Sequence, residues 1–319
     1  LQERGLAGHG LTRPELAVLL CYSKAELKEA LAQSSLTESQ YALNEAYTAF
    51  PESLVNKYEA DIRSHRLIKQ IAATQMSNSL IHRVGVTAVQ RMIDGGANIE
   101  QTLASYLAVK NILKTDELWA EIDNSKQLTH ELQVKMFFAV QGLLRRSMRL
   151  ILRQSHGNID IEGNIKRYEA GVNFFFSNIG SLLQDEEKES WQSIVDEYVA
   201  GGVEESLAKR VAACNFGLAA FDIIDAHYAI ENGELSDTSE LYFVVRSILG
   251  CQWLEAQIRD FSVTNQWTAK AREALLDELY SQQSQLVALI VDAGKKEIAN
   301  GFDKSDPGTS LVMSLVQAF

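Results

Sequence analysis

Apolar residues recur along most of the chain at intervals of three and four, the spacing of one face of an α-helix. Proline occurs at positions 14, 51 and 307, so residues 52–306 contain none. Because proline in a helix interior costs about 3 kcal/mol, long helices can form throughout this span. The alternating β-branched runs that mark strands are missing. The pattern predicts an all-α fold of long antiparallel helices in one or two packed bundles.

Capping and turn residues mark where helices begin and end. The sequence TRPE, residues 12–15, is a capping box with proline in the first turn, and SKAE, residues 23–26, repeats the box. We therefore expect the first helix to bend or restart near the second box. Pro51 is expected to open a helix, and the Gly95-Gly96 pair to end one. Further helices are expected over residues 128–157, 160–183, 185–200, 203–231, 238–261 and 268–300, with a short one after Pro307.

One segment rich in Gly, Asn and Asp, SHGNIDIEGN at residues 155–164, is the candidate domain boundary. It would separate an N-terminal helical layer, residues 1–157, from a C-terminal bundle, residues 158–319. A single domain is the alternative.

The expected helix around RLIKQIAATQMSNSLIHRVG, residues 66–85, carries a polar line at every fourth position. Such a line can be a ligand site, a solvated face or a joint between helices. The small residues Ala72, Ala73 and Ser77 would let a neighbouring helix approach closely, so we favour the joint. The line consists of Arg66, Gln70, Thr74, Asn78 and His82, of which the last two are expected to hydrogen-bond to a neighbour.

Composition narrows the classes of function. The 319 residues are 46% hydrophobic, enough for a substantial core. The net charge of −12 argues against a nucleic-acid partner, which needs a basic face. No apolar run reaches the roughly 18–20 residues that span a bilayer, and the N-terminus lacks the layout of a signal peptide. The widely spaced Cys21, Cys214 and Cys251 are expected to be reduced, buried thiols of a cytoplasmic protein.

The common catalytic and cofactor motifs are absent. There is no G-x-G-x-x-G turn after a strand, no phosphate-binding loop and no G-x-S-x-G elbow. None of the six histidines has an acidic residue three positions before it, which excludes the Glu-x-x-His pairs of di-metal bundles. We therefore assign no catalytic, cofactor-binding or metal-binding residue. The remaining candidates, Asp222, Asp225 and His227, are interpreted as surface or capping groups rather than as the centre of a helical enzyme.

Arginines cluster in QGLLRRSMRLILRQ, where Arg145, Arg149 and Arg153 form one line at i, i+4 spacing. They can form an anion-binding site, because guanidinium groups suit carboxylates and phosphates. They can also form salt bridges within the protein. Residues 185–205 hold eight acidic residues and one lysine. We favour pairing between this acidic run and the arginine line.

Three blocks resemble one family: GLAGHGLTRPELAVLLCYSKAELKEAL (5–31), FP (50–51) and HRLIKQIAATQMSNSLIHRVG (65–85). They are similar to the C-terminal part of the large-subunit, NAD-specific glutamate dehydrogenases of bacteria. The most specific piece is LTRPELAVLL, residues 11–20. The resemblance is clear over residues 1–160 and compatible to the end of the chain.

The resemblance implies a parent enzyme that oxidatively deaminates glutamate to 2-oxoglutarate and ammonium while reducing NAD. In that family the catalytic lysine and the nucleotide-binding domain lie before the LTRPEL block. The resemblance thus implies a non-catalytic helical domain that holds no cofactor itself. It also implies two partners, the upstream dehydrogenase domain of the same polypeptide and further copies in a homo-oligomer. The leading role is structural. The alternatives are an effector-binding module near residues 145–153, a free-standing helical adaptor and an autonomous helical enzyme around Asp222.

Overall fold

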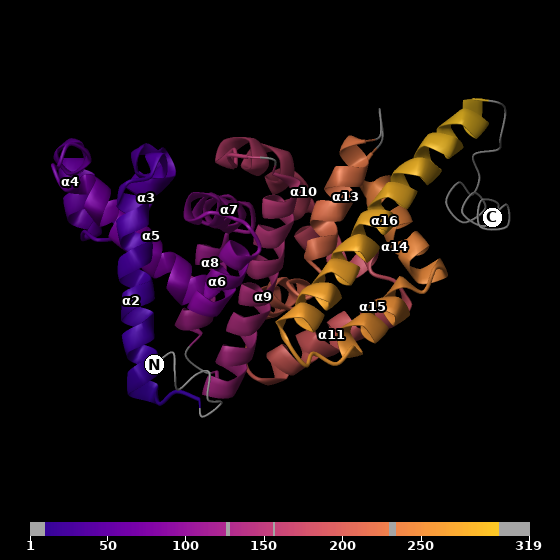
Figure 1. Ribbon diagram of the computed structural model, residues 1–319. Helices are drawn as coiled ribbons and strands as arrows, with labels where there is room; N and C mark the ends of the chain where they lie inside the picture. Colours follow the sequence, from indigo (N-terminus) through magenta and orange to yellow (C-terminus); the bar gives the residue numbers. More distant parts are fainter. Residues whose placement is uncertain (1–9, 126–127, 156, 230–233, 300–319) are drawn as a thin grey trace. The chain divides into compact units, whose positions relative to one another are not determined.

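The computed structural model describes residues 10–125, 128–155, 157–229 and 234–299 (Figure 1). All regular structure in these residues is helical, which confirms the predicted all-α class. The chain forms two compact units. Unit 1 comprises residues 1–111 and 144–165, and unit 2 comprises residues 112–143 and 166–319.

Unit 1 begins with α2 (Arg13–Ala32), which is one continuous helix. The first capping box is present, because the Glu15 carboxylate accepts hydrogen bonds from the Thr12 backbone N–H at 2.8 Å and from its hydroxyl at 2.7 Å. The second box, at residues 23–26, lies inside the helix, so the expected restart there is wrong. Leu27 and Leu31 are buried beyond it, and this packing favours continuing the helix over a new cap.

Short helices follow α2 and pack around α5 (Ile68–Val84). Pro51 caps α4, as expected. Both α2 and α3 lie against α5, whose Ala72, Ala73 and Leu80 are fully buried. The helices of this part are η1 (Ser35–Glu38), α3 (Gln40–Tyr47), α4 (Glu52–Arg63) and α6 (Val86–Asp94).

The core helix of unit 1 is α7 (Ile99–Ile112), whose residues are buried on nearly every side. Tyr106 is fully buried, and its hydroxyl lies 2.6 Å from that of Ser79 on α5. Lys110 forms a largely buried ion pair with Glu45 of α3. These contacts join α7 to both neighbouring helices.

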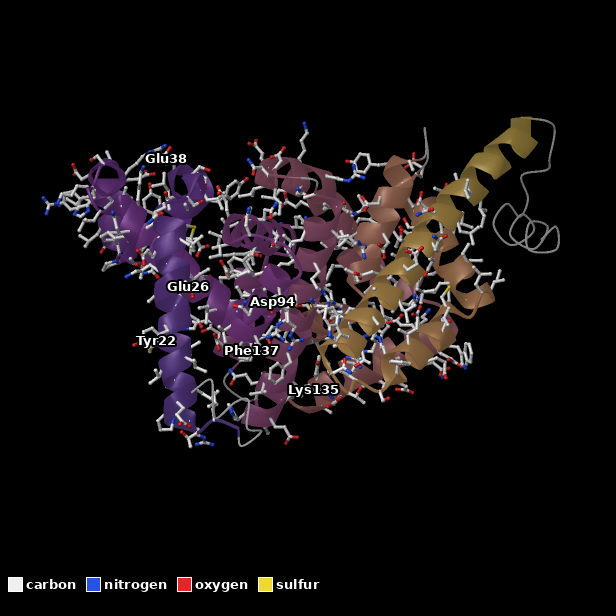
Figure 2. All side chains as sticks on the ribbon, viewed as in Figure 1. Tyr22, Glu26, Glu38, Asp94, Lys135 and Phe137 are labelled. Atoms are coloured by element: carbon white, nitrogen blue, oxygen red, sulfur yellow. The ribbon has the colours of Figure 1, made fainter. Side chains whose placement is uncertain are left out.

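Unit 2 contains α8 (Thr115–Asn124) and most of the C-terminal helices. α11 packs against α12. Both α13 and α14 pack against α16, and α15 lies beside α14 and α16. Figure 2 shows the side chains that fill and surround these helices. α9 (His130–Gln154) and α10 (Ile161–Leu182) are divided between the units, because residues 144–154 and 161–165 belong to unit 1. The other helices of unit 2 are α11 (Asp185–Ala200), α12 (Glu205–Ala213), α13 (Leu218–Tyr228), α14 (Leu235–Ile248), α15 (Cys251–Asp260) and α16 (Gln266–Ala299).

Two of the long helices expected from the sequence are broken in the structure. The span 203–231 divides into α12 and α13 at residues 214–217, and the span 238–261 divides into α14 and α15 at Leu249-Gly250. Gly250 adopts a left-handed conformation, with φ of 61°, which ends α14. The short helix expected after Pro307 lies outside the described residues. The expected domain boundary near residue 157 stays a prediction, and residues 112–143 group with the C-terminal helices in unit 2.

Candidate functional site

Four of the five residues of the polar line lie along the flank of α5, and Arg66 lies in the turn before this helix. Arg66 and Gln70 are exposed, and the half-buried Thr74 donates its hydroxyl to the Gln70 carbonyl at 2.7 Å. Asn78 is half-buried. His82 is exposed and reaches α2, where its Nε2 lies 2.8 Å from Nζ of Lys24. One end of the line therefore contacts a neighbouring helix, and the role of the whole line as a joint stays a prediction.

The surroundings of His82 disfavour the charged form of its ring. Burial and the charges of Lys24 and Arg83 lower its pKa, because each disfavours the charged imidazolium. In its neutral form the ring can accept a hydrogen bond from the Lys24 ammonium at Nε2. The contact therefore links α5 to α2 without a carboxylate.

In the arginine line, Arg145 binds the end of α5. Its Nε donates to the Val84 carbonyl at 2.6 Å, one of the carbonyls that a helix C-terminus leaves without an intrahelical partner. Burial and the charge of Arg91 lower the pKa of Arg145. Arg149 is half-buried and Arg153 is exposed. An arginine at a helix C-terminus also interacts favourably with the helix dipole.

The acidic run 185–205 forms ion pairs with residues outside the arginine line. Lys135 pairs with Glu197 at 2.5 Å, Lys209 with Glu205 at 2.5 Å, and Arg246 with Glu187 at 2.8 Å. The proposed pairing of the run with the arginine line stays a prediction.

The candidates of the FDIIDAH segment hold helices together. The expectation that Asp222 is a surface or capping group is wrong, because its side chain is buried and its Oδ2 faces the Tyr242 hydroxyl at 3.4 Å. Asp225 accepts hydrogen bonds from Arg167, at 2.7 and 3.0 Å, and from the Tyr168 hydroxyl at 2.7 Å. Burial and Asp225 raise the pKa of Tyr168, so its phenol keeps the proton that it donates.

His227 does not join the two aspartates in these contacts. Its Nδ1 lies 3.4 Å from the Thr238 hydroxyl of α14. No group of three or more His, Cys, Asp or Glu side chains in the described part of the chain is placed to hold a metal ion.

Sequence reasoning missed a buried charge cluster around Arg246 of α14. Its guanidinium donates to Glu187 of α11 at 2.8 Å, to Gln283 of α16 at 3.3 Å, and to Glu255 of α15. Glu255 also accepts from the Tyr280 hydroxyl at 2.7 Å. Burial alone would raise the pKa of Glu255, but the charge of Arg246 and these hydrogen bonds lower it to about 2. The cluster joins four helices of unit 2.

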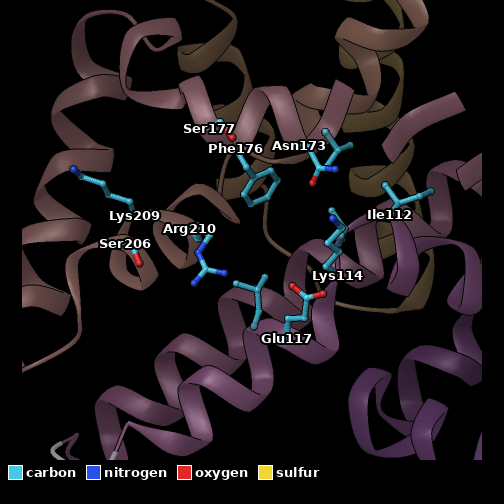
Figure 3. A pocket seen from close by; sticks show the side chains of 12 residues that line it. Ile112, Lys114, Glu117, Asn173, Phe176, Ser177, Ser206, Lys209 and Arg210 are labelled. Atoms are coloured by element: carbon cyan, nitrogen blue, oxygen red, sulfur yellow. The ribbon is translucent and has the colours of Figure 1, made fainter. Parts of the chain in front are cut away.

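A pocket of about 350 Å³ opens in unit 2 between α8, α10 and α12 (Figure 3). Lys114, Lys209 and Arg210 supply positive charge, and Glu117 supplies negative charge. Arg210 also pairs with Glu121, Lys209 with Glu205, and Lys114 with Glu169 at 3.6 Å. The remaining lining residues are Ile112, Leu113, Leu118, Val172, Asn173, Phe176, Ser177 and Ser206.

Lys114, at the N-terminus of α8, has an unusual backbone conformation. Its φ of 49° and ψ of 44° lie in the left-handed region. Among the described residues, it is the only non-glycine residue with a positive φ. Residues held in this region cost free energy and cluster at functional sites. The conformation places Lys114 as the N-cap of α8, on the wall of the pocket.

Comparison with known proteins identifies the family. The model of the family described as "Glutamate dehydrogenase, C-terminal" matches residues 8–306. The NAD-specific glutamate dehydrogenase of Pseudomonas aeruginosa is 32% identical over 302 residues, which cover 93% of this chain and 19% of the relative. That of Halomonas elongata is 30% identical over 95% of this chain and 19% of the relative. That of Mycobacterium tuberculosis is 27% identical over 92% of this chain and 18% of the relative.

The chain spans about a fifth of the length of these curated relatives, so it corresponds to one part of a larger polypeptide. No helix among the described residues is long and apolar enough to cross a bilayer. The family match covers nearly the whole chain, including both compact units. The chain belongs to the glutamate dehydrogenase C-terminal domain family.

Proposed function

We propose that this chain is the non-catalytic C-terminal helical domain of a cytoplasmic, NAD-dependent glutamate dehydrogenase. The parent enzyme deaminates L-glutamate oxidatively to 2-oxoglutarate and ammonium and reduces NAD. The domain braces the dehydrogenase portion of the same polypeptide and supports a homo-oligomer. The observation that carries the proposal is the family match over residues 8–306 in a chain that covers 19% of its relatives.

The use of the polar residues supports a structural role. Asp225 binds Arg167 and Tyr168, Arg145 binds the end of α5, and Arg246 joins α11, α14, α15 and α16. These side chains hold helices in place, and a side chain committed to such contacts is not available to bind a substrate without breaking them.

The test compares the complete polypeptide with a version that ends before residue 10. Oligomeric mass is measured by light scattering, and glutamate-dependent NADH formation is followed during heating. We expect the truncated enzyme to lose oligomeric mass and to inactivate at a lower temperature. An unchanged mass together with an unchanged inactivation temperature would contradict a bracing and assembly role.

A second candidate, binding of a small anionic effector, is favoured by the pocket of unit 2. Lys114, Lys209 and Arg210 line it together with apolar side chains, an arrangement that suits a small organic anion. Calorimetric titration of the complete enzyme with 2-oxoglutarate and with inorganic phosphate tests this. A heat that disappears in Lys114→Gln, and persists in a Lys57→Gln control on α4, would support the site. A signal equal in both variants would exclude it.

A further inference from the structure

The first half of α2 is apolar around nearly its whole circumference, yet exposed. The segment LAVLLCY, residues 16–22, advances by about 100° per residue and so covers every side of the helix. Leu16 is 52% exposed, Val18 44%, Leu19 40% and Tyr22 72%. Cys21 is exposed as well, so the expectation of a buried thiol is wrong for this cysteine. We name Leu16, Val18, Leu19, Cys21 and Tyr22 the α2 apolar patch.

The second half of α2 shows which side faces unit 1. Leu27 and Leu31 are buried, and Leu20, which lies on the same side of the helix, is half-buried. Val18 and Tyr22 lie roughly 160–200° away from Leu20 around the helix axis. Val18 and Tyr22 therefore point away from the helices that cover the second half, whereas Leu16 lies about 40° from Leu20, on the same side, and is still 52% exposed. Figure 2 labels Tyr22 on the first half of α2 and Glu26 on the second.

An apolar surface of this kind is normally covered. Helices that are hydrophobic all round are buried in a larger structure, and large exposed apolar patches on soluble proteins mark contact sites. Polar residues border the patch: Arg13 and Glu15 precede it, and Lys24 and Glu26 follow it. An apolar centre with a polar rim is the usual composition of a protein interface.

We propose that the α2 apolar patch docks into an apolar groove on the dehydrogenase portion of the same polypeptide. This proposal rests on the proposed function and names the surface that carries it. About four-fifths of the length of the relatives lies outside the matched region, which is that of a C-terminal domain. The family match begins at residue 8, a few residues before α2 begins at Arg13. In the proposed parent enzyme the dehydrogenase portion belongs to the same polypeptide, so it meets α2 at high effective concentration.

The groove that fits this patch has a definite chemistry. It accepts aliphatic side chains of leucine and valine size along its floor, and it offers a hydrogen-bond acceptor near one wall for the Tyr22 hydroxyl. Such docking would bury α2 along both halves, the second against α5 and the first against the dehydrogenase portion.

Cys21 provides a reporter inside the patch. In the complete enzyme, the rate of thiol labelling at Cys21 is measured by peptide mass spectrometry and compared with its rate in denaturant. The control is Lys57→Cys, which places a thiol at an exposed position on α4, outside the patch. The buried Cys214 and Cys251 report in the same experiment that the fold is intact.

We expect folding of the complete enzyme to slow labelling of Cys21 at least about tenfold, while the control thiol changes less than about twofold. The double variant Leu19→Glu/Tyr22→Glu should restore labelling of Cys21 and leave Cys214 and Cys251 protected. Equal rates at Cys21 and the control thiol, or equal slowing at both, would overturn the proposal.

Dilution separates docking within one polypeptide from contact with a second copy. Protection within the polypeptide is independent of enzyme concentration, whereas protection that vanishes on hundredfold dilution would assign the patch to a second copy and overturn the proposal. The assembly function is tested separately by truncation. If Cys21 is freely reactive while truncation still lowers oligomeric mass, the docking surface alone is wrong.

Discussion

At the scale of single residues, Arg246 carries the largest predicted effect. Its side chain is buried between Glu187 and Glu255, so its removal takes a counter-charge from both carboxylates, although Glu255 keeps its pair with Arg259. Breaking a buried pair in this way costs about 3–5 kcal/mol. We expect Arg246→Met to lower the free energy of unfolding of the chain by that amount in urea denaturation. Lys209→Met, which removes a surface pair with Glu205, should change it by less than about 1 kcal/mol.

Two results would contradict this prediction. Equal losses in Arg246→Met and Lys209→Met would show that the buried cluster contributes no more than a surface pair. A variant with Arg246→Met that is as stable as the parent would show that the carboxylates find other partners. A change in circular dichroism at low denaturant would instead report local unfolding of α14.

The same cluster sets a dependence on pH. The pKa of Glu255 is lowered from 4.5 to about 2 in the folded protein. Burial raises it, but the charges of Arg246 and Arg259 and the hydrogen bonds from Arg246 and Tyr280 together outweigh burial. A carboxyl group with a lowered folded pKa stabilises the protein above its ordinary pKa, and this contribution is lost as the pH falls from 4.5 toward 2. We therefore expect the free energy of unfolding to fall over this range.

The comparison with Arg246→Met isolates Glu255 from other acidic groups. In that variant Arg259 and Tyr280 remain but the contribution of Arg246 to the lowered Glu255 pKa is lost, so stability should fall less steeply between pH 4.5 and pH 2. Urea denaturation at several pH values measures both slopes. Parallel slopes in parent and variant would show that other carboxylates dominate acid unfolding.

The sequence could not predict this cluster, and the reason is separation along the chain. Arg246 lies 59 residues from Glu187 and 37 from Gln283, so the contact depends on how four helices pack. Residues with regular spacing were visible instead: Arg145, Arg149 and Arg153, and the polar line on α5. Periodicity reveals which residues share a face, and the identity of the partner on the next helix requires the fold.

At the scale of elements, Gly85 decides how α5 ends. Its φ of 88° and ψ of 138° are strained for any residue with a side chain, and a Cβ there would lie 2.8 Å from a terminal nitrogen of Arg145. Gly96 is the matched control, because its φ is 103° and nothing lies within 4 Å of an added Cβ. Both substitutions to alanine should cost about 1 kcal/mol through backbone strain.

Gly85→Ala should cost about 1 kcal/mol more than Gly96→Ala, because it displaces Arg145 from the Val84 carbonyl. Thermal unfolding of the two variants gives the difference. Adding Arg145→Met to each variant tests the cause. If the added cost of Arg145→Met is the same in both backgrounds, the steric link between Gly85 and Arg145 is absent.

Much of the helical architecture could be predicted because it is encoded locally. The expected spans 160–183 and 185–200 correspond closely to α10 (Ile161–Leu182) and α11 (Asp185–Ala200). The break between α12 and α13 was missed because apolar periodicity continues across residues 214–217. The false restart in α2 has the opposite cause. A local capping signal was present, and tertiary packing of the helix overrode it.

At the scale of the whole molecule, the family of the chain and its role in the parent enzyme rest on different observations. The family follows from matches along residues 8–306. The role of this part within the parent enzyme is proposed from how its polar residues are used and from its share of the relatives' length. The net charge of −12 is consistent with a protein partner for the apolar patch rather than a nucleic acid.

The last prediction concerns the chain by itself: it should not oxidise glutamate. Hydride transfer requires glutamate and NAD to be held together, with the reacting atoms about 3–3.5 Å apart, by groups placed for that purpose. Asp222, Asp225 and Arg246 instead make contacts between helices. Purified chain with glutamate and NAD should produce NADH no faster than buffer, while the complete enzyme serves as positive control. Turnover that rises in proportion to chain concentration and survives repurification would show that this domain carries a reaction centre.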